Sequence, residues 1–284
     1  MEMTRKLSTQ RFFDKFWKYT FCVILSILVL FPVYICITGG FKSTGALRAD
    51  PIGLPNPVEL SNYGSILKGT SGRYWRALLN SVIVAALTVS LTLAVCVPAA
   101  FAIARVKFRF ANFFRLFFMS GLLFPIAVAM LPLYIQVRDL HLIDNFFGVV
   151  LPQIAFQLPM SILLLIGFFK GIPNELEDAV MIDGYGPLGF LFVIVIPLST
   201  PILATTAVII LIASWNNFLL PLLVFNTDKF YTLPLGVMDF QGQYSSNWSM
   251  ILSYLTLTML PAIILFISAQ KYIVAGLTGG AVKG

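Results

Sequence analysis

The sequence predicts an all-α, polytopic membrane protein with six spanning helices and one short helix between two of them. Hydrophobic residues make up 58% of its 284 residues and charged residues only 11%, whereas a soluble domain carries about 25% charged residues. Apolar runs of about 20 residues, the length a helix needs to cross a bilayer core of about 30 Å, recur along the chain. The basic residues stand in short clusters between these runs, which indicates membrane topology rather than nucleic-acid binding.

The charge-free runs predict the spans in order. We expect a membrane domain over 19–270, flanked by a basic N-terminal tail, 1–18, and a C-terminal tail, 271–284. The first run is interpreted as a retained span, because no small-residue cleavage site closes it before Phe41. The expected spans are 19–41, 77–104, 116–137, 146–169, 201–225 and 249–270.

The fifth span needs a separate argument. Residues 184 to 227, a stretch of 44, carry no charge, and as one helix they would extend about 66 Å, twice the hydrocarbon thickness. Gly184, Gly186, Pro187 and Gly189 interrupt or bend a helix at the start of this stretch. We therefore expect an interfacial helix first and the span itself at 201–225.

The basic residues also predict the orientation. The tail 1–18 carries five Lys and Arg residues and the loop 105–115 carries four, so both segments are expected in the cytoplasm with both termini. The loop 171–197 falls on the same side but is acidic, and the single basic residue beside it is Lys170. Its acidic residues are Glu175, Glu177, Asp178 and Asp183.

These acidic residues fit a short helix within 173–184. A start at 173 or 174 places Glu175, Glu177 and Asp178 at the positive end of the helix dipole, and Gly184 is a good C-terminal stop. Leu176, Ala179 and Val180 are expected on one face, since they are three or four residues apart. A helix of about ten residues is not stable alone in water. It must pack on its own protein or on a partner.

The same loop resembles a known family. Glu177-Asp178-Ala179-x-x-x-Asp183-Gly184, followed by Ile194-x-Ile196-Pro197, resembles the cytoplasmic loop of ABC importer permeases. The family pattern is Glu-Ala-Ala, three variable residues, an acidic residue, Gly, nine variable residues and Ile-x-Leu-Pro, so Asp178 and Ile196 depart from it. Other segments, including the tail 270–284, resemble the carbohydrate uptake branch and its shorter, maltose-type subunit. Besides the tail, these segments are Asn56-Pro57, Asn62-Tyr63 and Trp215-Asn216-Asn217-Phe218.

The resemblance implies a role for the short helix. In that family it is a coupling helix seated in a cleft of a separate ATPase subunit, where Glu177 would pair with a basic residue and Gly184 would form the turn. The implied docking residues are Glu177, Asp178, Ala179, Asp183 and Gly184. The tail would lie between the ATPase subunits, through Leu277, Thr278, Gly279 and Gly280.

The resemblance also implies the partners. They are a second permease, two ATPase subunits, an extracytoplasmic substrate-binding protein, a sugar and membrane lipid, in the inner membrane of a bacterium. The chain has no Gly-x-x-x-x-Gly-Lys-Ser/Thr motif, so ATP and Mg are expected on the ATPase and no cofactor on this chain. We expect no catalytic residues and no metal site, since His141 has no second His or Cys beside it.

The expected spans contain no ionisable side chain other than Cys and Tyr. Ion-coupled carriers usually keep carboxylates at mid-membrane, so an ion-coupled carrier or channel without ATPase partners is the weaker alternative, and an intramembrane enzyme is disfavoured as well. Polar uncharged spans fit a neutral substrate, although a charged saccharide stays open because partner chains could supply basic residues.

Two further sets of residues are candidates for handling substrate. Trp215, Asn216 and Asn217 form the densest polar and aromatic group within a span and are candidates for the substrate path, with helix packing as the alternative. The outer loop 239–248 aligns with the family loop that enters the binding protein, and there an interfacial turn is the alternative. Its candidate residues are Gln241, Gln243, Tyr244 and Trp248.

Overall fold

The computed structural model describes residues 2–69, 72–242 and 246–279, with side chains described for 15–69, 72–242 and 246–271. The described residues contain helices and no strand, so the predicted all-α class is confirmed. Among them, four helices are long and apolar enough to cross a membrane, or up to six if each of two bent pairs is one span. The chain divides into two compact units, residues 1–70 with 237–260 and residues 71–236 with 261–284.

The first unit is built on the long helix α1 (Glu2–Gly40), which the short helices α2 (Thr44–Ala49) and α3 (Ser61–Lys68) follow. The expected tail 1–18 and the first span thus form one continuous helix. The start of α13 (Trp248–Gly279) packs against the end of α1, where the Ser253 hydroxyl donates to the Gly40 carbonyl at 2.8 Å. A Cβ at Gly40 would lie 3.0 Å from the Ser253 backbone, so this close approach requires glycine.

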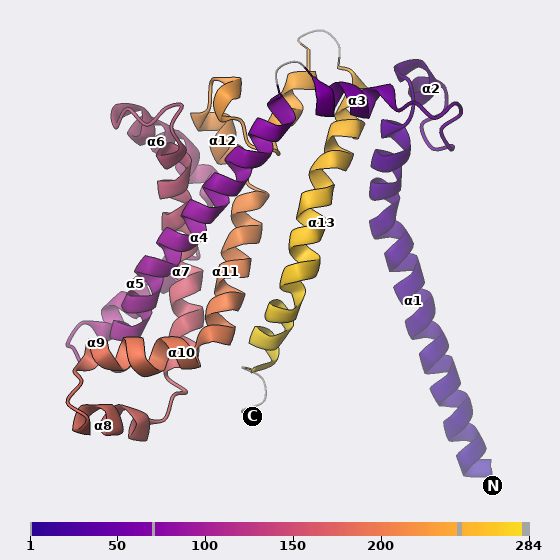
Figure 1. Ribbon diagram of the computed structural model, residues 1–284. Coiled ribbons are helices and arrows are strands. Elements are labelled where there is room, and N and C mark those ends of the chain that lie inside the picture. The colour runs from indigo at the N-terminus through magenta and orange to yellow at the C-terminus, as the bar shows by residue number, and fades with distance from the viewer. Residues whose placement is uncertain (1, 70–71, 243–245, 280–284) are drawn as a thin grey trace. The chain divides into compact units, whose positions relative to one another are not determined.

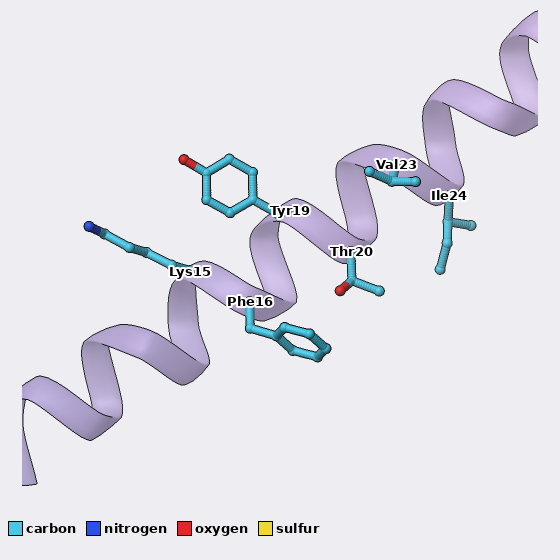
Figure 2. Close-up of a pocket in the computed structure, with 6 residues that line it drawn as sticks. All are labelled: Lys15, Phe16, Tyr19, Thr20, Val23 and Ile24. Atoms are coloured by element: carbon cyan, nitrogen blue, oxygen red, sulfur yellow. The ribbon is translucent and has the colours of Figure 1, made fainter.

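The apolar surface of α1 carries a shallow groove of about 490 Å³. Figure 2 shows the six side chains that line it, all on this helix: Lys15, Phe16, Tyr19, Thr20, Val23 and Ile24. Apolar side chains lie exposed along this helix from Phe16 to Ile37. A helix with such a surface is suited to lipid or to another membrane chain rather than to water.

The second unit has α4 (Arg73–Arg105), α7 (Phe146–Phe169) and α11 (Thr200–Trp215) at its centre (Figure 1). Buried apolar side chains from these helices and from the short elements near Arg105 form one core. Three of them, Ala100, Ile162 and Leu165, are fully buried. The helix α7 has the bounds expected for the fourth span, and α4 extends the second by a few residues at its start.

The third expected span, 116–137, is not one straight helix. It is the bent pair α5 (Ala111–Gly121) and α6 (Ile126–Asp139), whose axes differ by 99°. Pro125 explains the break, because proline has no N–H to donate and disfavours helical geometry in the residue before it. The four connecting residues, 122 to 125, are all exposed.

The fifth expected span, 201–225, is also interrupted. The helix α11 ends at Trp215, and α12 (Leu219–Val224) begins after a three-residue break. Before α11, a helical segment runs from α9 (Pro187–Phe190) through a π-helical stretch (Leu191–Val195) to α10 (Ile196–Leu198). This segment meets α11 at 78°. The expected helix ahead of the fifth span is therefore present, and the expected interruption lies at 183–186, between α8 and α9. A further sharp bend, which the sequence did not indicate, lies at Ser199.

Candidate functional site

The short acidic helix is α8 (Asn174–Ile182), and Figure 1 shows it beside α9 at the end of the second unit opposite α6 and α12. It begins at 174 and stops before Gly184, as predicted. Gly184 has φ +84°, and its N–H donates to the Met181 carbonyl while the Tyr185 N–H donates to the Val180 carbonyl, both at 3.1 Å. These two bonds make a Schellman motif, which requires the left-handed conformation that glycine adopts without strain.

The inward face of α8 is narrower than the sequence predicts. Val180 is 6% exposed and lies in the core with Phe101 and Phe190. Leu176 and Ala179, expected on the same face, are exposed instead. That prediction was wrong because the residue that accompanies Val180 inward, one turn earlier, is the charged Glu177.

Glu177 pairs within this chain. Its Oε2 accepts a hydrogen bond of 2.8 Å from Nη2 of Arg105, the last residue of α4. Nη1 of the same guanidinium donates to the Ile172 carbonyl at 2.8 Å, and the guanidinium carbon lies 5.6 Å from the centre of the Phe190 ring. The Arg105 side chain is 6% exposed and that of Glu177 is 24% exposed. One buried cation thus joins α4, the turn before α8, α8 itself and α9.

The outer face of α8 consists of Asp178, Ala179, Met181 and Ile182, all exposed. Ile182 is 86% exposed and Met181 48%. Just after the helix, Tyr185 and Leu188 add exposed apolar surface, while Asp183 and Gly184 are exposed too. Exposed apolar side chains with acidic neighbours, on a helix too short to stand alone, indicate a protein-binding surface.

The predicted path residues lie together at the break after α11 but have different surroundings. Trp215 is buried, Asn216 is exposed, and Asn217 accepts a hydrogen bond from the Leu220 N–H at 3.1 Å, at the start of α12. Trp215 is thus a packing residue in this structure, and Asn217 stabilises the helix restart.

A buried polar cluster lies next to this break. The Gln153 side-chain oxygen accepts hydrogen bonds from the Ser214 hydroxyl at 2.6 Å and the Thr88 hydroxyl at 3.0 Å, so one amide joins α4, α7 and α11. Among the described residues, the Gln153 Nε2 and the Thr92 hydroxyl are buried without a hydrogen-bond partner. The cluster holds the end of α11 in place through neutral hydrogen bonds.

The other predicted sites are only partly described. Gln241 is exposed and forms an isolated backbone bridge with Ser246, and Trp248 is 56% exposed at the start of α13. Gln243 and Tyr244 lie outside the described residues. Leu277, Thr278 and Gly279 form the last helical residues of α13, without described side chains, and Gly280 lies outside the described residues.

Sequence reasoning missed the role of Arg105. It treated this arginine only as a marker of topology, although a basic residue at the end of a span and an acidic helix on the same side of the membrane are a possible ion pair. The two residues are 72 positions apart. Nothing in the sequence indicates which of the basic residues in the loop 105–115 meets Glu177.

Comparison with known proteins identifies the chain. Residues 94–279, which include α8, match the family described as binding-protein-dependent transport system inner membrane component. The chain belongs to this family. The resemblance of the α8 loop to ABC importer permeases is thereby confirmed, and the chain is a transport permease.

Named relatives of this permease match over most of their length. It is 34% identical to the arabinooligosaccharides transport system permease protein AraQ of Halalkalibacterium halodurans, over 92% of this chain and 93% of the relative. It is 30% identical to the trehalose/maltose transport system permease protein MalG of Thermococcus litoralis, over 92% and 94%. A crystal structure of a bacterial ABC transporter involved in the import of the acidic polysaccharide alginate has the same fold, with a TM-score of 0.80 at 23% identity over 93% of this chain and 97% of that one.

Proposed function

We propose that this permease forms the translocation path of an ATP-driven importer for a sugar or oligosaccharide, together with a second permease. Two ATPase subunits and an extracytoplasmic binding protein complete the complex. The observation that carries this proposal is α8, a nine-residue helix whose inner face is fixed to its own chain and whose outer face is exposed. Such a helix transmits force to a partner because it cannot shift independently of the membrane domain.

The outer face has the chemistry of a docking surface for an ATPase. Ile182 and Met181 supply apolar anchors, and Asp178 and Asp183 supply charges at the rim. Four of the five docking residues proposed from the resemblance are exposed here. The fifth, Glu177, faces inward and pairs with Arg105, so any contact that it makes with an ATPase is made while Arg105 holds its carboxylate.

The substrate class rests on the relatives and on the chemistry of the spans. AraQ and MalG are named for transport of arabinooligosaccharides and of trehalose and maltose. The buried groups near the break after α11 are amides, hydroxyls and an indole, so this part of the spans is polar without a charge, as suits the passage of a neutral sugar. No carboxylate accompanies them in the described part of this cluster, so an ion-coupled carrier is not favoured.

The helix breaks at 122–125 and 216–218 support the proposal that these segments line the translocation path. Backbone outside a helix is tolerated at membrane depth only where protein covers it or where it lines a water-filled cavity. Residues 122 to 125 are exposed and non-helical, and Asn216 is exposed at the second break. We assign these breaks to the path or to its contact with the second permease, with Asn216 exposed there and its chain neighbours Trp215 and Asn217 supporting the break.

The remaining assignments belong to the same proposal. The permease lies in the bacterial inner membrane with six spans, and α8 and both termini are in the cytoplasm. ATP and Mg bind the ATPase subunits. The tail from Leu277 to Gly280 reaches between those subunits, while Gln241, Gln243, Tyr244 and Trp248 face the binding protein.

Uptake into cells tests this function. A strain that lacks the chain, with or without a plasmid copy, is given radiolabelled arabinotriose, maltotriose or trehalose. We expect the copy to restore uptake of at least one sugar. That uptake should persist when an ionophore collapses ion gradients while glycolysis maintains ATP, and should stop when arsenate depletes ATP. Uptake that follows the ion gradient and ignores ATP would establish the carrier alternative.

A further inference from the structure

We propose that Arg105 is a positioning residue that fixes α8 on the end of α4, and that Glu177 acts within this chain as its ion-pair partner. This inference deepens the proposed function and rests on it, because it concerns how the docking helix is held. We call the contact of Arg105 with Glu177, the Ile172 carbonyl and Phe190 the α4–α8 latch.

The geometry of the latch is that of a built contact rather than a chance surface pair. Both terminal nitrogens of the guanidinium are used, each at 2.8 Å, one by a side chain and one by a backbone carbonyl. The Phe190 ring adds a cation–π contact, and Phe190 is itself 1% exposed. Only Arg provides this fork of donors with a planar face, so Lys would satisfy one partner at a time.

Burial separates this pair from the other ion pairs described on the second unit. The side chains of Arg73 and Asp228 are 51% and 42% exposed, and those of Arg138 and Asp139 are 57% and 60% exposed. Exposed pairs of that kind contribute little, whereas removing one partner of a buried pair leaves a desolvated charge. We therefore expect the latch to be the contact that keeps α8 packed on the end of α4.

The latch also leaves α8 able to engage a partner. Arg105 uses one oxygen of the Glu177 carboxylate, and the side chain retains 24% of its exposure. A basic residue of an ATPase could approach the remaining edge, which would make the carboxylate a bridge between α4 and the partner. Because the Nε of Arg105 is buried without an acceptor among the described residues, the latch gives specific placement rather than maximal stability.

Hydrogen exchange of the α8 backbone tests the latch directly. The full chain is purified with whatever subunits accompany it, and exchange of the 174–182 segment is followed by mass spectrometry. Arg105→Met and Glu177→Met keep the apolar stems and remove the charges. We expect each to speed exchange about tenfold, since a hydrogen bond to a charged group is worth about that factor or more. The double variant should exchange no faster than the faster single, and Arg105→Lys should fall between.

The matched controls are Arg109→Met in the loop after α4 and Glu175→Met on α8, both exposed residues. Arg109→Met should leave exchange of 174–182 unchanged, and Glu175→Met, which removes only a favourable charge at the start of the helix, should speed it a few-fold at most. The latch is overturned if Arg105→Met and Glu177→Met leave this exchange unchanged, or if their effects multiply in the double variant. This readout needs no ATPase, so it is separate from the proposed function, which fails if no MgATP hydrolysis accompanies the wild-type chain.

Discussion

Gly184 is the residue at which the geometry of α8 makes the sharpest demand. Its φ of +84° costs an L-residue about 1 kcal/mol, although no atom would clash with an added Cβ. We expect Gly184→Ala to loosen the end of α8 by about that amount, with Gly184→Asn milder. Thermal unfolding and exchange of 180–185 measure it. The control is Gly186→Ala, at φ −81° and with equally open space. It should have a net effect of only about a few tenths of a kcal/mol, because the loss of Gly at an N-cap is offset by the lower freedom of the unfolded chain. Equal effects at both positions would contradict a special demand for glycine at 184.

At the same scale, two threonines one turn apart on α4 give a matched pair. Thr88 donates to Gln153, whereas the buried Thr92 hydroxyl has no partner among the described residues. Thr88→Val should lower stability in detergent by about 0.6 kcal/mol, the average for a hydrogen bond between membrane helices. Thr92→Val should be neutral or stabilising, because it removes an unpaired buried polar group. The reverse ranking in thermal unfolding of the two variants would contradict the polar cluster as described.

At the scale of the element, α8 is expected to bind through its outer face. Ile182→Glu places a charge where an 86% exposed apolar side chain stands, so it should cost little in folding but strongly reduce retention of an ATPase on the purified chain. A loss of at least tenfold, about 1.4 kcal/mol, is expected. Leu140→Glu, at 66% exposure in the loop after α6, is the control and should retain the ATPase. Retention by both variants would remove the outer face from the interface.

The elements also show where sequence reasoning stops. The bounds of α7 and the start and end of α8 follow from charge-free length, helix caps and Gly184, which are local signals. The breaks at 122–125 and 216–218 were missed because hydropathy measures length, not straightness, and Pro125 is one of many prolines within the apolar runs. The inward face of α8 was predicted wrongly because the apolar Leu176 is exposed, whereas the charged Glu177 faces inward. Only the position of Arg105 in space explains this arrangement.

At the scale of the whole molecule, the all-α class and the transport family were predictable. Composition limits the chain to the membrane, and the spacing from Glu177 through Gly184 to Pro197 indicates the family. The latch was not predictable, because it depends on which of several basic residues ends beside α8 after α4 and α7 have packed. Long-range pairing of that kind is a property of the folded chain.

The most direct test of the central claim is the MgATP hydrolysis that accompanies the affinity-tagged chain when it is purified from its native membrane in mild detergent. We expect an ATPase subunit and a second permease in the wild-type preparation, with hydrolysis that falls at least tenfold per mole of chain in Ile182→Glu and persists in Leu140→Glu. A wild-type chain that purifies intact with no ATPase and no MgATP hydrolysis would contradict it.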